Sequence, residues 1–161
     1  MSTLSVDPGV NGTGWAKWKN GNFVGYGTLH YKQTGEWLLH AREIVVAFAE
    51  LVRLHKAMKL VIECPVFMRG YGGYTTASTG DLVKLTLLTG MLVESFFEHA
   101  PGEDVVLVEP SKWKGQLPKD VCRKRVEAEL KTSFDLLLKE RISSHAVDAI
   151  GIGLWAHGRF K

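Results

Sequence analysis

Hydrophobic residues near the start of the chain occur in short runs separated by turn residues, which is the pattern of β-strands. Thr3–Asp7 is an apolar run that ends in an acid, and we expect it to form a buried strand. Turn residues follow at Pro8-Gly9. Gly14–Lys19 and Asn22–His30 are then joined at Asn20-Gly21, a strong β-hairpin signal. The chain therefore opens with a predicted meander of three strands.

The pattern then changes to helices that alternate with strands. Apolar residues from Trp37 to His55 recur three and four positions apart, which is the period of an amphipathic helix. Lys59–Glu63 is a second predicted buried strand that again ends in an acid, and Pro65 terminates it. Phe67–Gly80 is rich in Gly, Tyr and Thr and has no apolar period, so we expect an exposed, mobile loop.

Asp81–His99 is predicted to be a second long helix, and its later part is apolar on nearly every side. Such a helix must be covered on more than one side. A dimer interface and a central position in the core of one chain meet this requirement about equally well.

One more strand and two helices complete the chain. Asp104–Glu109 is a third predicted buried strand that Pro110 stops, and Ser111–Leu117 is expected to be a basic loop. Pro118 can occupy the first position of a helix that runs to about Lys131.

The end of the chain carries clear helix signals after a stretch without any. Thr132–Arg141 predicts no definite element. Ser143 or Ser144 is a suitable N-cap for a final helix that extends to about His157, with Gly158 as its C-cap.

The predicted order β-β-β-α-β-α-β-α-α indicates a single α/β domain over residues 1–161. It predicts a five-stranded mixed sheet, with a three-strand antiparallel meander, further parallel strands and helices on both faces. The right-handed crossover after the third strand can bring Lys59–Glu63 beside Thr3–Asp7 in parallel. Ligand sites in such sheets lie at the carboxyl ends of the parallel strands.

Composition excludes several classes of protein. The 161 residues are 45% hydrophobic, enough to form the core of one domain. No segment approaches the roughly 20 apolar residues of a membrane span, and the N-terminus lacks the pattern of a secretory signal. Cys64 and Cys122 form neither a CxxC nor a CxxH pattern. We expect free thiols in a reducing compartment such as the cytoplasm.

The net charge of +3 permits nucleic-acid binding without requiring it. The distribution of charge is more informative, because six basic residues lie close together: Lys112, Lys114, Lys119, Arg123, Lys124 and Arg125. Such a cluster is by itself more often a solvated helix face than a phosphate-binding surface.

Two acids stand at the carboxyl ends of predicted neighbouring strands. If the strands pair, Asp7 and Glu63 meet, and two carboxylates repel each other unless a cation or proton lies between them. Oxygen-rich sites of this kind suit Mg²⁺ or Mn²⁺. Each acid also has an ordinary explanation, since Asp7 precedes a Pro-Gly turn and Glu63 could face solvent at the end of its strand.

His145 and Asp148 are three residues apart at the start of the final helix and therefore share one face. If this face packs at the edge where Asp7 and Glu63 lie, the four groups can hold two divalent ions for phosphoryl transfer. His145 could instead carry a proton, or be an ordinary surface residue. Asp148 stands in an apolar context, where a lone acid is costly. Taken together, the four residues favour a metal site.

Four stretches of the chain resemble the RuvC Holliday-junction resolvases, including phage-encoded relatives. LSVDPGVNGTGWA is similar to the family's opening strand and turn, LVIECPVFM to its second acidic strand, and SSHAVDAIGIGLWAH to its closing helix. EPSKWKGQLPKDVCRKRV is similar to the family's lysine-bearing loop and the helix after it. The resemblance runs from Leu4 to about His157. DPGxxxTG is moderately specific, and its combination with IE and HxxD in this order is strong.

The resemblance implies an RNase H-like fold, a homodimer, and paired incisions across a four-way DNA junction with Mg²⁺ or Mn²⁺, two ions per active site. A branch-migration motor could be a further partner. The metal-binding and catalytic groups it implies are Asp7, Glu63, His145 and Asp148. The residues that it implies contact DNA are Phe67, Arg69, Tyr71, Tyr74, Lys112, Lys114, Lys119 and Arg123.

The family inserts an aromatic ring into the centre of the junction. Phe67 follows the acid by four residues, where some relatives have three, so Tyr71 and Tyr74 are alternative wedges. Phe67 could also be a core residue that anchors the loop.

Other functions remain open at this point. The chain could be a different RNase H-like nuclease that acts on flap or branched DNA or on structured RNA, or an inert junction-binding protein. A fragment of an actin-like kinase would share the fold, but the chain is too short for a two-lobed ATP cleft.

Overall fold

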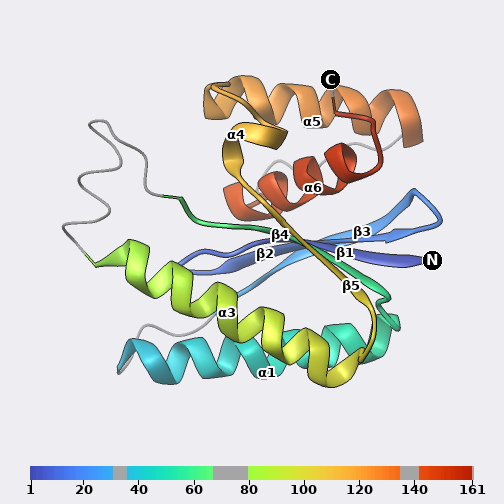
Figure 1. Cartoon of the computed structure of the whole chain (residues 1–161). Helices are drawn as coiled ribbons and strands as arrows, with labels where there is room; N and C mark the ends of the chain where they lie inside the picture. The colour runs from blue at the N-terminus through green and yellow to red at the C-terminus, as the bar shows by residue number, and fades with distance from the viewer. Residues whose placement is uncertain (31–35, 67–79, 135–141, 161) are drawn as a thin grey trace.

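The computed structural model describes residues 1–30, 36–66, 80–134 and 142–160. These residues form a five-stranded mixed sheet with helices on both faces, which confirms the predicted fold class (Figure 1). The predicted loop Phe67–Gly80 lies outside the described residues except for its last position, and so does most of Thr132–Arg141.

The strands lie in the order β3-β2-β1-β4-β5 across the sheet. The first three pair antiparallel, and β1, β4 and β5 run parallel to one another. Asn20 and Gly21 join β2 to β3 with φ values of 52° and 77°, the left-handed backbone that a tight hairpin turn requires. The strands are β1 (Ser2–Asp7), β2 (Thr13–Lys19), β3 (Asn22–Leu29), β4 (Lys59–Glu63) and β5 (Asp104–Val108).

Helices form two separate layers on the sheet (Figure 1). On one face, α1 (Trp37–His55) and α3 (Asp81–His99) pack against each other and share a core with β1 and β4. The other face carries α4 (Pro110–Trp113), α5 (Lys119–Phe134) and α6 (Ser144–Ala156). In this second layer α6 lies directly on β1 and β2, and α5 packs against α6.

The segment after β5 differs from the predicted basic loop over Ser111–Leu117. Pro110–Trp113 forms a short helix, α4, with the proline in its first turn. A proline suits that place because its φ is already helical and its missing N–H has no helical partner to lose. Trp113 is buried at the end of this helix beside Val61 and Ile152. Pro110, which was predicted to stop the strand, therefore begins a helix after β5 has ended at Val108.

The helix α3 uses its apolar residues on two sides. Leu88, Leu92 and Phe96 are buried in the core that α1 and the sheet share. Val83 and Phe97 are exposed on the outer side of the helix. The core position accounts for the inner face of α3, and no other described element covers its outer face.

Strand alternation assigns the two strand-end acids to the same face of the sheet. Leu4 and Val6 point into the core beneath α1 and α3, together with Leu60 and Ile62 of β4. Successive side chains of a strand point to opposite faces. Asp7 therefore projects toward the layer that contains α6, and Glu63 does the same.

Buried polar contacts hold α6 in place on the sheet. Ser5 Oγ donates to the Ala149 carbonyl at 2.7 Å and accepts from Trp18 Nε1 at 2.9 Å. Ser143 caps the helix by accepting from the Ala146 N–H at 3.1 Å. Gly14 of β2 must lack a side chain, because a Cβ there would collide with the His145 carbonyl. This close approach places the first turn of α6 over the end of β1.

Two further observations concern the cysteines and the helices. Cys64 and Cys122 form no disulfide. In the part of the chain that the structure describes, no helix is long and apolar enough to cross a membrane.

Candidate active site

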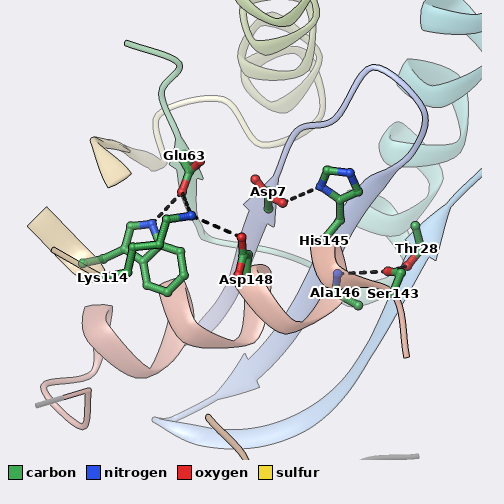
Figure 2. Close-up of polar contacts among 9 residues, drawn as sticks. Asp7, Thr28, Glu63, Lys114, Ser143, His145, Ala146 and Asp148 are labelled. Carbon is green, nitrogen blue, oxygen red and sulfur yellow. Dashed lines mark hydrogen bonds and ion pairs between the residues drawn. The ribbon is translucent and has the colours of Figure 1, made fainter. Parts of the chain in front are cut away.

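The site forms where β1 and β4 end side by side. Val6 pairs with Ile62 in the parallel register, so Asp7 and Glu63 are the next residues of adjacent strands. Figure 2 shows both carboxyl groups near the first turns of α6, with Asp148 and His145 facing them. All four residues that the sequence singles out are thus brought together, from three distant parts of the chain.

Asp7 and His145 form a close pair. His145 Nδ1 lies 2.6 Å from Asp7 Oδ2, and Asp7 is only 5% exposed. Burial raises the pKa of the Asp7 carboxyl. The hydrogen bond to Asp7 raises the pKa of the His145 imidazole. Both groups therefore tend to keep a proton, and one proton held between Nδ1 and Oδ2 satisfies both.

The carboxyl group of Glu63 also has a raised pKa. Burial, followed by the charge of Asp7, raises the pKa of its carboxyl from 4.5 to about 7, although Lys114 and Trp113 partly oppose this. The site holds three carboxylates against one ammonium group and one imidazole, so its carboxylates outnumber its positive charges even when His145 is protonated.

Lys114 lies inside the site, between two carboxylates. Its Nζ is 3.2 Å from Asp148 Oδ2 and 3.7 Å from Glu63 Oε2. Burial alone would lower the pKa of this ammonium group, but the charges of Glu63 and Asp148 outweigh burial and raise it. The resemblance implied that Lys114 contacts DNA, together with Lys112 and Lys119. Those two are exposed, whereas Lys114 points at the acids (Figure 2).

Trp113 is a site residue that sequence reasoning missed. Its Nε1 donates to Glu63 Oε2 at 2.6 Å, while its ring is almost fully buried. The ring packs over Gly151 of α6, where a Cβ would collide with it. A buried indole needs a hydrogen-bond acceptor, so a tryptophan shortly after the third predicted strand was the available signal. Trp113 orients one oxygen of Glu63, and the other accepts no hydrogen bond from the described residues.

Trp113→Phe should therefore loosen Glu63 without removing any charged group. Loss of a residue that orients a metal ligand typically costs about 10- to 100-fold in metal affinity. We expect a loss of Mn²⁺ affinity in that range, measured by titration with isothermal calorimetry. Trp155→Phe is a matched control, because Trp155 has no hydrogen bond to the site among the described residues. Equal Mn²⁺ affinity in wild type and Trp113→Phe would contradict the orienting role.

The donor set fits a hard divalent cation in kind. Asp7, Glu63 and Asp148 supply carboxylate oxygens, the ligands that Mg²⁺ and Mn²⁺ prefer. Nearby positive charge does not fully balance these carboxylates, which is one reason why the pKa of Glu63 is raised. Among the described residues, however, no three His, Cys, Asp or Glu side chains are already arranged around one point as metal ligands. The ammonium group of Lys114 instead lies between two of the candidate ligands.

A small pocket with both basic and acidic lining residues adjoins the site. A pocket of about 180 Å³ lies between the first turns of α5 and α6, and Lys119, Arg123 and Asp148 are among its lining residues. Arg123 also pairs with Glu127 at 2.8 Å. Lys119 and Arg123, both named for DNA contacts, thus lie beside a candidate catalytic acid. Four other residues named for DNA contacts lie outside the described part of the chain: Phe67, Arg69, Tyr71 and Tyr74.

Solved junction resolvases share this fold. A structure of Thermus thermophilus RuvC in complex with a Holliday junction substrate matches 100% of this chain and 98% of its own, with a TM-score of 0.72 and 15% identity. A second T. thermophilus RuvC structure gives 0.67 at 16% identity, covering 100% and 99%. The yeast mitochondrial Holliday junction resolvase Ydc2 gives 0.55 at 12% identity, covering 98% and 79%.

No protein-family model matches the sequence, and no curated protein matches it. The likeness is therefore one of architecture, at low sequence identity and over the full chain. It agrees with the resemblance drawn from the strand-end acids and the closing helix. The chain has the RNase H-like fold of the RuvC Holliday-junction resolvases.

Proposed function

We propose that this protein is a metal-dependent endonuclease that resolves four-way DNA junctions. The observation that carries the proposal is the meeting of Asp7, Glu63 and Asp148 at the carboxyl ends of β1 and β4, with His145 bonded to Asp7. The shared fold supports it, because a RuvC of this architecture is known in complex with a Holliday junction substrate.

The roles of the residues follow from their positions. Asp7, Glu63 and Asp148 would hold one or two Mg²⁺ or Mn²⁺ ions, with His145 as a fourth candidate ligand. When bound, such ions supply activation of the attacking water and stabilisation of the leaving oxygen. His145 can hold or release a proton beside Asp7. Trp113 keeps the Glu63 carboxylate oriented throughout.

DNA is held by the basic residues around the site in this proposal. Lys112 and Lys119 are exposed, and Lys119 and Arg123 line the pocket that Asp148 also lines. Phosphate contacts by such residues position a duplex without reading its sequence. The aromatic wedge, from Phe67, Tyr71 or Tyr74, stays a prediction because these residues lie outside the described part.

A homodimer would supply two sites for two symmetric cuts. The uncovered outer face of α3, with Val83 and Phe97 exposed, favours such a second copy. Exposed apolar residues on one helix face are typical of an interaction surface.

The test is incubation of the protein with a synthetic four-way junction and Mg²⁺. We expect nicks at symmetric positions in two strands of like polarity, and none when EDTA replaces Mg²⁺. Parallel reactions with flap DNA and an RNA hairpin separate the junction resolvase from other RNase H-like nucleases. Binding of the junction without any cutting would instead favour an inert junction-binding protein.

A further inference from the structure

The position of Lys114 has a consequence for metal binding. Its ammonium group contacts Asp148 and Glu63, two of the three carboxylates that would hold a divalent cation. A cation that bridges these two carboxylates would need the space that the ammonium group occupies (Figure 2). One positive charge also opposes the arrival of another at a few ångströms, by several kcal/mol at the dielectric of a partly buried site.

The local structure favours Lys114 in this place without locking it there. Lys114 caps the end of α4, its ammonium group lies 4.8 Å from the centre of the Trp113 ring, and the backbone turns away at Gly115, where φ is +60°. The side chain is 21% exposed, so part of it contacts solvent. A four-carbon stem lets the ammonium group leave while the backbone of α4 stays where it is.

We propose that Lys114 is a built-in stand-in cation, which holds Glu63 and Asp148 together in the metal-free protein and must leave before a divalent cation bridges them. This inference rests on the proposed metal site and adds that one of the chain's own residues competes for it. Lys114 therefore raises the concentration of divalent cation at which the site is filled. Once displaced, its ammonium group is free to approach a phosphate. Among the described residues, Lys112 and Lys119 form no ion pair with a carboxylate, whereas Lys114 forms two.

The test measures binding of Mn²⁺ alone, without DNA, by the EPR signal of the free ion. Lys114→Met removes the competing charge and keeps the apolar stem, so we expect Mn²⁺ to bind about tenfold more tightly or better. Lys114→Gln removes the same charge and keeps a polar end, which gives a second variant if the first does not fold. Lys124→Met is the matched control, because it removes an equal charge from an exposed position in the same basic cluster.

A second readout follows the folded state itself. Without metal, the Lys114 variants should melt at a lower temperature than wild type, because Glu63 and Asp148 then face each other without a cation. Mn²⁺ should raise the melting temperature of these variants more than that of wild type.

The outcomes separate this inference from the proposed function. Tighter Mn²⁺ binding in both Lys114 variants and unchanged binding in Lys124→Met support the stand-in role. Equal or weaker binding in the Lys114 variants overturns that role and leaves the metal site standing. Absence of Mn²⁺ binding from wild type and all variants overturns the inference together with the proposed function.

Discussion

Asp7→Asn should abolish junction cutting while junction binding persists. The substitution removes the buried charge at the centre of the site, where Asp7 lies beside Glu63 and accepts from His145. Loss of a ligand that holds a catalytic cation removes several kcal/mol of transition-state stabilisation, so we expect the cutting rate to fall about a thousandfold or more. Cutting is measured on a labelled four-way junction under single-turnover conditions, and binding by gel shift with Ca²⁺ in place of Mg²⁺.

Asp104→Asn is a suitable control for the charge change. Asp104 begins β5, at the opposite end of the strand from the site, and its carboxylate pairs with Lys59, 2.7 Å away. This variant should cut at the wild-type rate. Retention of full cutting by Asp7→Asn would remove Asp7 from the mechanism.

Glu63→Gln should change stability in a way that depends on pH. Because burial raises the pKa of Glu63 from 4.5 to about 7, the folded protein binds this proton more tightly than the unfolded chain does. The stability of metal-free wild type should therefore fall as pH rises from about 4.5 to 7. A glutamine has no proton to lose, and it can still accept from Trp113.

The expected difference is largest above neutral pH. At pH 8 in EDTA, Glu63→Gln should be more stable than wild type by on the order of 2 kcal/mol, whereas at pH 5 the two should be nearly equal. Urea unfolding at both pH values measures the difference. Addition of Mg²⁺ at pH 8 should reduce it, because the cation favours the ionised glutamate. A difference that is the same at pH 5 and pH 8 would show that Glu63 is not buried among other acids.

The meeting of Asp7 and Glu63 was predictable from the sequence for a physical reason. Each acid ends a short apolar strand, and a right-handed crossover brings two such strands side by side in parallel. Side-chain alternation then assigns both acids to one face. His145 and Asp148 were predictable as a pair because three-residue spacing on a helix gives one face, and the structure docks that face on the site.

The surroundings of the acids were not predictable in the same way. The bond from Trp113 to Glu63 joins residues 50 positions apart, and it depends on a short helix that the sequence pattern presents as a basic loop. Lys114 resembles its exposed neighbour Lys112 in sequence, and only the turn of α4 directs one of them toward the acids. These contacts are decided by tertiary packing. The period of hydrophobic residues and the types of residue in a segment do not reveal that packing.

The most direct test of the account is the position of a divalent cation in crystals of the metal-bound protein. Crystals grown with Mn²⁺ should show an anomalous scattering peak between the Asp7 and Glu63 carboxylates, within coordination distance of both. Absence of a peak there at saturating Mn²⁺, or a peak only on another surface of the molecule, would contradict the account.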